Sequence, residues 1–238
     1  MQAIILAGGE GTRLRPLTYE IPKALVPVQG RPLTDHVLDI LKKAGVTEVF
    51  LSVSYLAQKI KDYYDQNPYP GIQINYLLEN QRMGTAGPLI LLKRQGVSID
   101  QNFIVVNGDN LYSLDANQWG NFHSVNSGVV TLALTEIDRD KVSNYGVMSM
   151  DGVKIIDFIE KPKVEDAPSN LISSGYYIFS PEVFDYIDEA RDFLMLEKDV
   201  FPVLAKSGLL FGYKGQGQWF DTGTMERYDQ VIKEWKGI

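Results

Sequence analysis

The stretch that decides the fold is Ala3-Ile4-Ile5-Leu6-Ala7-Gly8-Gly9-Glu10-Gly11-Thr12-Arg13-Leu14-Arg15-Pro16-Leu17-Thr18, followed closely by Pro22-Lys23-Ala24-Leu25-Val26-Pro27. A short apolar run, typical of a buried strand, leads directly into a glycine-rich loop. Glycines let backbone N–H groups close around a bulky anion, and polyphosphate is the usual such anion. Arg13, Arg15 and Lys23 can add charge that backbone dipoles cannot supply. The opening therefore predicts a polyphosphate-binding loop.

Two commoner glycine-rich loops do not fit this stretch. A dinucleotide fingerprint requires G-x-G-x-x-G, and counting from Gly9 the third glycine position holds Leu14. A P-loop requires G-x-x-x-x-G-K-[ST], and the sequence contains no Gly-Lys-Ser or Gly-Lys-Thr. Neither a hydride-transfer enzyme nor a Walker-type ATPase is indicated.

The composition is that of an ordinary globular protein. The 238 residues are 45% hydrophobic and 22% charged, and none is cysteine, which excludes disulfides and thiolate metal sites. The net charge of −7 argues against nucleic acid as a partner. No apolar run is long enough for a membrane span, and no basic region precedes the first apolar run. We expect a cytoplasmic protein with no membrane partner.

Strand and helix patterns alternate through the first half of the chain. Apolar residues at 33, 37, 38, 41 and 44 share one helical face, which Gly45 ends. Such alternation implies βαβ units, and we expect an α/β fold, Rossmann-like, with three α/β/α layers and a mostly parallel mixed central sheet. The predicted strands are 3–6, 49–53, 72–78 and 103–106, and the predicted helices are 33–44, 56–64 and 85–93.

The second half is more mixed. Residues 148–153 look like a hairpin with Asp151-Gly152 as its two-residue turn. No linker or internal repeat is evident, and no hexapeptide repeats stand near residue 238, so we expect one domain over 1–238 without a C-terminal left-handed β-helix. The other predicted elements are strands at 129–134 and 172–179 and helices at 181–189, 197–206 and 224–235.

Motifs spread over nearly the whole chain carry a family resemblance. The opening resembles G-G-x-G-T-R-L-x-P-L-T followed by P-K-x-L-x-P, the pattern of the sugar-1-phosphate nucleotidyltransferases. Five later segments match that family in the same order, which is much more specific than any single match. They are Asn107-Gly108-Asp109, Tyr145-Gly146-Val147, Phe158-Ile159-Glu160-Lys161-Pro162, Ser174-Gly175-Tyr176-Tyr177-Ile178-Phe179 and Trp219-Phe220-Asp221-Thr222-Gly223-Thr224.

The resemblance implies a reaction in which a sugar 1-phosphate attacks the α-phosphorus of a nucleoside triphosphate and pyrophosphate leaves. It implies that Arg13, Lys23 and Asp109 are catalytic and that Asp109 and Asp221 bind Mg²⁺, for which two carboxylates plus phosphate oxygens are a suitable cage. Arg15 could equally be a solvated loop cation. The nucleotide-binding set would be Leu6, Gly8, Gly9, Gly11, Thr12, Arg13, Glu79, Gly84 and Thr85.

The resemblance also assigns residues to the sugar phosphate. Lys161 would contact its phosphate and Glu160 the sugar hydroxyls, while Gly146 would let the backbone approach the ring. Ser174 and Gly175 would line the same pocket. The family usually has asparagine where this chain has Ser174, which puts sugar recognition at that position in doubt.

Residues 79–89 should recognise the base. Relatives that transfer uridylyl or thymidylyl groups often have glutamine where this chain has Glu79. An ionised carboxylate only accepts hydrogen bonds, and guanine presents two adjacent donors, N1–H and the 2-amino group. Residues 84–89, Gly-Thr-Ala-Gly-Pro-Leu, also resemble the mannose-1-phosphate guanylyltransferases, so GTP and mannose 1-phosphate or a related hexose or heptose are favoured.

Alternatives stay open at this point. The chain could be a uridylyl- or thymidylyltransferase acting on glucose 1-phosphate or another sugar 1-phosphate. It could also be a non-catalytic regulatory subunit that binds nucleotide-sugars, although the retained charged residues speak against that. Trp119, Phe122 and Trp235 could serve the interface of a homo-oligomer, but packing in the core explains them as well.

Overall fold

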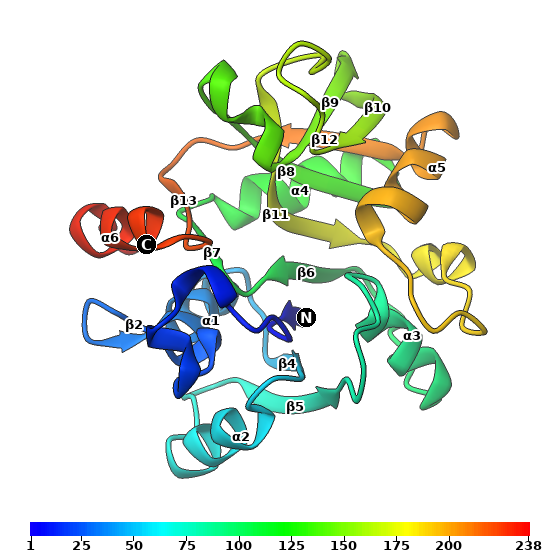
Figure 1. Ribbon diagram of the computed structural model, residues 1–238. Helices are drawn as coiled ribbons and strands as arrows, with labels where there is room; N and C mark the ends of the chain where they lie inside the picture. The colour runs from blue at the N-terminus through cyan, green and yellow to red at the C-terminus, as the bar shows by residue number, and fades with distance from the viewer. The chain divides into compact units, whose positions relative to one another are not determined.

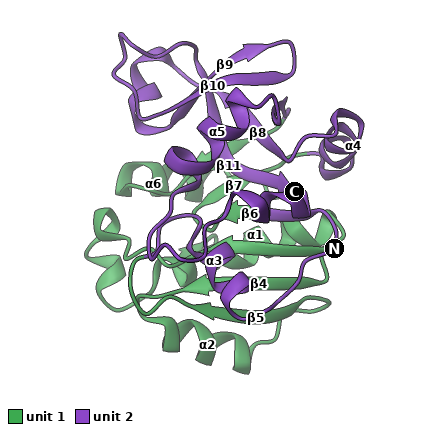
Figure 2. Ribbon diagram, turned by 90° about the vertical axis from the view of Figure 1, so that its right-hand side faces the viewer, with its two compact units in different colours: residues 1–82, 105–114, 217–238 green, residues 83–104, 115–216 purple.

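The computed structural model describes residues 1–238. The chain forms two compact units, each assembled from separated stretches (Figure 2). Unit 1 comprises residues 1–82, 105–114 and 217–238, and unit 2 comprises residues 83–104 and 115–216. That residues 1–238 make one domain stays a prediction. None of the helices is both long enough and apolar enough to cross a bilayer.

Unit 1 is built on parallel strands that follow the predicted βαβ pattern. Strand β1 pairs with β4 and β4 with β5, all in parallel, and β6 lies on the other side of β1 (Figure 1). The elements are β1 (Gln2–Leu6), β2 (Pro27–Val28), β3 (Arg31–Pro32), α1 (Leu33–Lys43), β4 (Glu48–Val53), α2 (Ala57–Gln66), β5 (Gln73–Leu78), β6 (Phe103–Asn107, of which residues 105–107 belong to this unit), β7 (Asn110–Tyr112), β13 (Trp219–Asp221) and α6 (Met225–Glu234).

Helix α1 illustrates how the sequence pattern becomes packing. Leu33, Val37, Leu38 and Leu41, which form the predicted apolar stripe, are all buried. The helix ends before Gly45, which takes a φ of +79° that a residue with a Cβ adopts only at a cost. The predicted helix is therefore confirmed to within one residue.

Unit 2 holds a mixed sheet in the order β11-β8-β12-β10-β9. Strand β12 runs parallel to β8, whereas β11 with β8 and β10 with β12 and β9 are antiparallel. Its elements are α3 (Gly87–Arg94), α4 (Ala116–Asn126), β8 (Val130–Glu136), β9 (Gly146–Asp151), β10 (Lys154–Glu160), β11 (Leu171–Phe179), α5 (Phe201–Lys206) and β12 (Leu210–Lys214). The expected α/β class with a mixed central sheet is confirmed.

Two local predictions were wrong. The hairpin turn is Gly152-Val153, because Asp151 pairs with Lys154 and Gly152 supplies the positive φ at the first turn position. The predicted helix 181–189 is only a 3₁₀ turn, Pro181–Tyr186. The Lys93 ammonium donates to the carbonyls of Phe184 and Ile187 in this segment.

The predicted helix 197–206 is interrupted. Residues Leu196–Val200 form a π turn, and the α-helix α5 begins only at Phe201. Pro202 explains the break, because it has no N–H to donate to the carbonyl four residues earlier. Helix α4 was not predicted, although Asp115 caps it by accepting from the amides of Asn117 and Gln118.

Two of the three aromatic residues that the sequence left ambiguous belong to the interior, and the third, Phe122, is half-buried. Trp119 and Trp235 are 2% and 3% exposed. The Trp235 indole also packs edge-on against Phe220 and donates to His36. Packing in the core, the alternative to a subunit interface, is therefore confirmed for both tryptophans.

Candidate active site

The glycine-rich loop of unit 1 follows β1 and begins with the small residues Ala7, Gly8 and Gly9. The Ala7 amide donates to the Ser52 carbonyl, after which the loop passes Gly8 and Gly9. Gly11 has a φ of +63°, and its carbonyl accepts from the Thr18 hydroxyl at 2.7 Å. A Cβ on Gly11 would lie 2.9 Å from the Thr18 methyl carbon, so the loop needs glycine there. A 3₁₀ turn, Thr12–Leu14, then presents exposed Thr12 and Arg13.

Lys23 and Asp109 form an ion pair beside this loop. Lys23 begins a 3₁₀ turn after Pro22, and Asp109 follows the carboxyl end of β6, as predicted. The Lys23 Nζ lies 2.5 Å from Asp109 Oδ2, with the two side chains 12% and 34% exposed. Burial would raise the pKa of Asp109, but the charge and hydrogen bond of Lys23, aided by Arg13, outweigh it and hold that pKa below its usual value.

The strand pair β7–β13 (Figure 1) brings a second acidic residue, Asp221, close to Asp109 along the backbone. Asp221 stands opposite Asn110 in this antiparallel ladder, and both the amide and the hydroxyl of Thr222 donate to the Asp109 carbonyl. The ladder and these hydrogen bonds therefore bring the backbones of Asp109 and Asp221, which are 112 residues apart in sequence, to adjacent positions.

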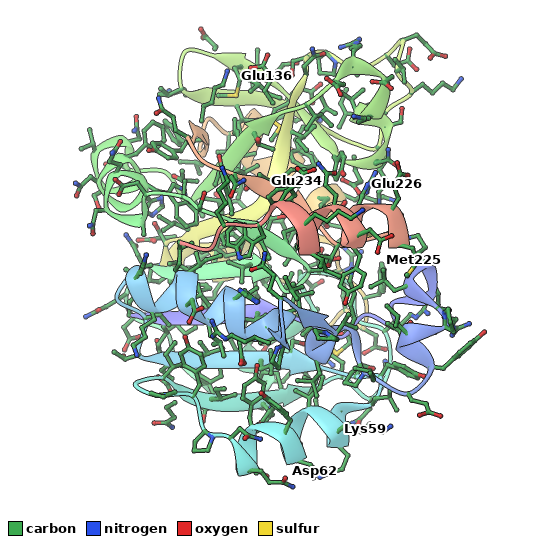
Figure 3. All side chains as sticks on the ribbon, turned by 90° about the vertical axis from the view of Figure 1, so that its left-hand side faces the viewer. Lys59, Asp62, Glu136, Met225, Glu226 and Glu234 are labelled. Carbon is green, nitrogen blue, oxygen red and sulfur yellow. The ribbon has the colours of Figure 1, made fainter.

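Asp221 is itself paired with Arg227 of helix α6, which runs from Met225 to Glu234 (Figure 3). The Thr224 hydroxyl caps the helix by accepting from the Arg227 amide, which fixes where helix α6 begins. The Arg227 Nη1 lies 2.5 Å from Asp221 Oδ2, and the side chains are 24% and 10% exposed. The other oxygen, Oδ1, accepts from the Gly223 amide.

Arg13 reaches the same region. A Cβ built on Gly223 would lie 2.6 Å from Asp221 Oδ1 and 3.1 Å from Arg13 Nη2, so the carboxylate and the guanidinium flank Gly223 together. We call Arg13, Lys23, Asp109, Asp221 and Arg227 the charged cluster. Its three cations and two carboxylates suit a polyphosphate and a hard metal ion.

The two carboxylates fit Mg²⁺ better than a metal that needs an all-protein cage. No group of three or more His, Cys, Asp or Glu side chains is placed to hold a metal ion. Mg²⁺ usually takes one or two carboxylates, and phosphate oxygens and water complete its shell. Asp109 and Asp221 can supply that pair of carboxylates.

Glu79 directly follows β5 and lies beside the glycine-rich loop. Its side chain accepts from the Ser52 hydroxyl at 2.5 Å, and a Cβ on Gly8 would lie 3.4 Å from Glu79 Oε1. The Glu79 amide extends the β4–β5 pairing by donating to the Val53 carbonyl. The structure thus brings Glu79 together with Gly8, as expected for two nucleotide-binding residues, while Leu6 is the last residue of β1.

The remaining predicted residues belong to unit 2. Thr85 donates to Glu197 Oε2 at 2.5 Å and accepts from the Leu196 amide. Burial raises the pKa of Glu197, the hydrogen bond from Thr85 opposes this, and the charges of Glu160 and Lys161 act on it in opposite directions. Gly84 has a φ of +79°, and a Cβ there would lie 2.3 Å from the Leu194 carbonyl oxygen.

Glu160 and Lys161 are neighbours in space as well as in sequence. Lys161 Nζ lies 3.1 Å from Glu160 Oε1, and the lysine side chain is 61% exposed while the glutamate is 12% exposed. Lys161 has a φ of +51°, an uncommon backbone conformation for a residue with a Cβ. Such strain occurs often at ligand-binding positions.

The other three sugar-site candidates have structural roles as well. Ser174 is fully buried and donates to the Ala133 carbonyl, inside the sheet. A Cβ on Gly146 would lie 2.2 Å from the Phe158 ring, so packing alone requires that glycine. Gly175, with a φ of +80°, lies where the β11–β8 register shifts. Their contact with a sugar stays a prediction.

Comparison with known proteins decides the family. The family model described as Nucleotidyl transferase matches residues 2–236. The chain belongs to the nucleotidyl transferase family. Two curated relatives are UTP--glucose-1-phosphate uridylyltransferase of Synechocystis sp., 36% identical over 98% of this chain and 63% of the relative, and mannose-1-phosphate guanyltransferase beta-B of Xenopus laevis, 39% identical over 94% and 61%. The chain thus spans less than two thirds of their length.

A solved structure of the same fold supports this placement in the nucleotidyl transferase family. HddC from Yersinia pseudotuberculosis, complexed with GMP-PN, superimposes with a TM-score of 0.79. The identity is 27%, and the match covers 99% of each chain. The family resemblance seen in the motifs is confirmed, as is the Rossmann-like α/β class.

Sequence reasoning about this nucleotidyl transferase missed three residues that contact predicted site residues. Arg227 pairs with Asp221, Ser52 donates to Glu79, and Glu197 accepts from Thr85. Arg227 could have been suspected from its place three residues after the helix cap Thr224. Nothing local marked Glu197, because its partner lies 112 residues away in sequence.

Proposed function

We propose that this protein transfers a guanylyl group from GTP to a sugar 1-phosphate, mannose 1-phosphate or a related hexose or heptose 1-phosphate, with release of pyrophosphate. The charged cluster at the end of the glycine-rich loop carries this proposal, because it joins polyphosphate-binding cations to paired carboxylates. Membership in the nucleotidyl transferase family supports the reaction class.

The step is an in-line displacement. A phosphate oxygen of the sugar 1-phosphate forms a bond to the α-phosphorus, and the bond from that phosphorus to the β-bridging oxygen breaks. Pyrophosphate leaves with the electron pair of the broken bond. The nucleophile is already an anion, so no general base is required, and catalysis depends on positioning and electrostatics.

The residues of unit 1 would act on the triphosphate. The amides near Gly8, Gly9 and Gly11 and the Thr12 hydroxyl would hold the phosphate chain, and Arg13 would bind its β/γ end as charge moves there. Lys23 would neutralise the α-phosphate while its partner Asp109 holds it in place. A magnesium ion held by Asp109 and Asp221 would supply Lewis-acid stabilisation of the α- and β-phosphate oxygens.

The residues of unit 2 would bind the second substrate. Lys161 has an exposed ammonium for a phosphate, and the carboxylate of Glu160 can accept from sugar hydroxyls. Thr85 would contact the nucleotide from the segment that includes Gly84.

Glu79 supports guanine as the base. Its carboxylate accepts from Ser52, and an ionised carboxylate can only accept, which suits the two adjacent N–H donors of guanine. The Xenopus relative is named a mannose-1-phosphate guanyltransferase, and the solved HddC carries GMP-PN. The Synechocystis relative is named a uridylyltransferase, so transfer from UTP, or from dTTP, to glucose 1-phosphate is the second candidate.

A regulatory subunit without catalysis is the candidate of a different class. It would bind a nucleotide-sugar but would not need the full charged cluster. Retention of Arg13, Lys23, Asp109, Lys161 and Asp221 favours an enzyme.

The test is pyrophosphate release with Mg²⁺ over a grid of five nucleoside triphosphates against six sugar 1-phosphates, repeated with chelator. We expect one strong combination with GTP, abolished by the chelator. A strong combination with UTP or dTTP would retain the enzyme and refute the base assignment. No turnover, together with nucleotide-sugar binding by calorimetry, would place the protein among regulatory subunits.

A further inference from the structure

The ion pair between Arg227 and Asp221 has a consequence for the proposed metal site. Arg227 lies against Oδ2 of the same carboxylate that would bind Mg²⁺, and the Gly223 amide engages Oδ1. Asp221 is only 10% exposed, so its charge needs compensation inside the protein. In the protein without ligands, Arg227 provides it.

A guanidinium and a divalent cation cannot share this position at no cost. Each carboxylate oxygen has more than one lone pair, so the limit is electrostatic rather than geometric. Two cations a few ångströms apart repel strongly where water is partly excluded. Binding of a metal to Asp221 therefore favours movement of Arg227 away from it.

Arg227 has a destination for that movement. Arg13 Nη2 and Asp221 Oδ1 both flank Gly223, so the end of the phosphate-binding loop lies within reach of the region that Arg227 occupies. A guanidinium binds phosphate oxygens through paired hydrogen bonds. A phosphate chain would accept Arg227 when the metal displaces it from Asp221.

We propose that Arg227 is a counter-ion that changes its partner when ligands bind. It pairs with Asp221 when no metal is bound, and it binds the phosphate chain once a metal occupies Asp221. This inference rests on the proposed function, because it presumes the metal and polyphosphate sites. It makes Arg227 a further substrate-binding residue of the same site, and it opposes metal binding before the polyphosphate arrives.

The exchange predicts opposite changes in two affinities when Arg227 is replaced by methionine. Without polyphosphate, Mn²⁺, measured by electron paramagnetic resonance, should bind Arg227→Met about 3- to 10-fold more tightly than the wild type, because the Arg227 guanidinium no longer competes for Asp221. At saturating Mn²⁺, tripolyphosphate, measured by calorimetry, should bind the variant about 3- to 10-fold more weakly, because the variant lacks the guanidinium that the metal displaces onto the phosphate chain. Arg227→Lys should lie between the two proteins in both measurements.

A control variant and a stability measurement distinguish the predicted changes in affinity from the effects of misfolding. Arg31→Met removes an arginine that pairs with Asp39 at 2.7 Å in the same unit, outside the charged cluster, and should change neither affinity. Mn²⁺ should raise the melting temperature of Arg227→Met more than that of the wild type, since it replaces the lost counter-ion.

The outcomes separate this inference from the function on which it rests. Unchanged affinities, or a fall in both, would overturn the exchange while the metal and polyphosphate sites remain. Absence of Mn²⁺ and tripolyphosphate binding in the wild type would overturn the proposed site and the exchange with it. Tripolyphosphate carries no base, so an error in the choice of GTP would leave the result unaffected.

Discussion

Replacement of Asp109 by asparagine separates charge from shape at the centre of the charged cluster. Asparagine keeps the size of the side chain and one acceptor oxygen for Lys23, but it removes the negative charge 2.5 Å from the lysine ammonium. We expect a folded protein that has lost most of its Mg²⁺-dependent turnover.

The cost in stability follows from the burial of the pair. Exposed ion pairs contribute up to about 1 kcal/mol, and breaking a fully buried one costs about 3–5 kcal/mol. With side chains 12% and 34% exposed, Lys23–Asp109 lies between these limits, so we expect a loss of about 1–3 kcal/mol. For a chain of this length that lowers the melting temperature by about 2–12 °C, which leaves the fold intact at 25 °C.

The loss in rate should be larger. Removing one preorganised electrostatic contact to a developing charge typically costs about 10²- to 10³-fold in kcat. Asp109→Asn would lose a metal ligand and the partner that holds Lys23, so we expect a loss of at least that size at saturating Mg²⁺. The assay is pyrophosphate release together with scanning calorimetry.

Asp39→Asn is the matched control for this prediction. Asp39 pairs with Arg31 at 2.7 Å in the same unit, and its replacement should lower stability without changing kcat. A kcat for Asp109→Asn within a few-fold of the wild type, at any Mg²⁺ concentration, would refute the assignment of Asp109 to metal and substrate binding.

Three further results are expected. Glu79→Gln should lower the ratio of kcat/KM for GTP over UTP by about 10-fold or more, and an unchanged ratio would exclude Glu79 from base recognition. Burial lowers the pKa of His123 to about 4, against the opposing charge of a nearby glutamate. The free energy of unfolding, measured in urea, should therefore fall by up to about 3 kcal/mol as the pH falls from about 6.5 to 4. His123→Gln should flatten that slope. Gly84→Ala would place a Cβ 2.3 Å from the Leu194 carbonyl oxygen, so it should lower the melting temperature much more than Gly96→Ala. Gly96 shares the positive φ but has open space around it. Equal shifts in melting temperature would show that the contact at Gly84 can relax.

The sequence was sufficient where function depends on position along a strand. Asp109 was placed at the carboxyl end of an apolar strand, and the structure has it there, next to Lys23. Asp221 was expected as the second carboxylate, and the β7–β13 ladder brings it beside Asp109. The placement of Asp109 could be predicted because ligands bind at the carboxyl ends of parallel strands, and that of Asp221 because its motif fixed the residue.

Contacts that arise only from tertiary packing could not be predicted. Glu197 lies in a π turn that the sequence suggested as ordinary helix, and its bond to Thr85 depends on how distant segments meet. Gly146 was interpreted as a point of close approach to a sugar, whereas the Phe158 ring already excludes any side chain there. A glycine in a motif can thus be required by packing, by a ligand or by both, and sequence alone does not separate these causes.

The charge of the whole chain explains why the cluster is built from opposite signs. At a net charge of −7, the protein as a whole repels a polyphosphate, so attraction must come from cations held at one place. Cations alone would bind the triphosphate and its products alike, and they would provide no site for a metal. Asp109 and Asp221 pair with Lys23 and Arg227, and in the proposed function they would also supply oxygen ligands for Mg²⁺. Three cations against two carboxylates leave an excess of one positive charge, which would favour a polyphosphate substrate in the proposed function.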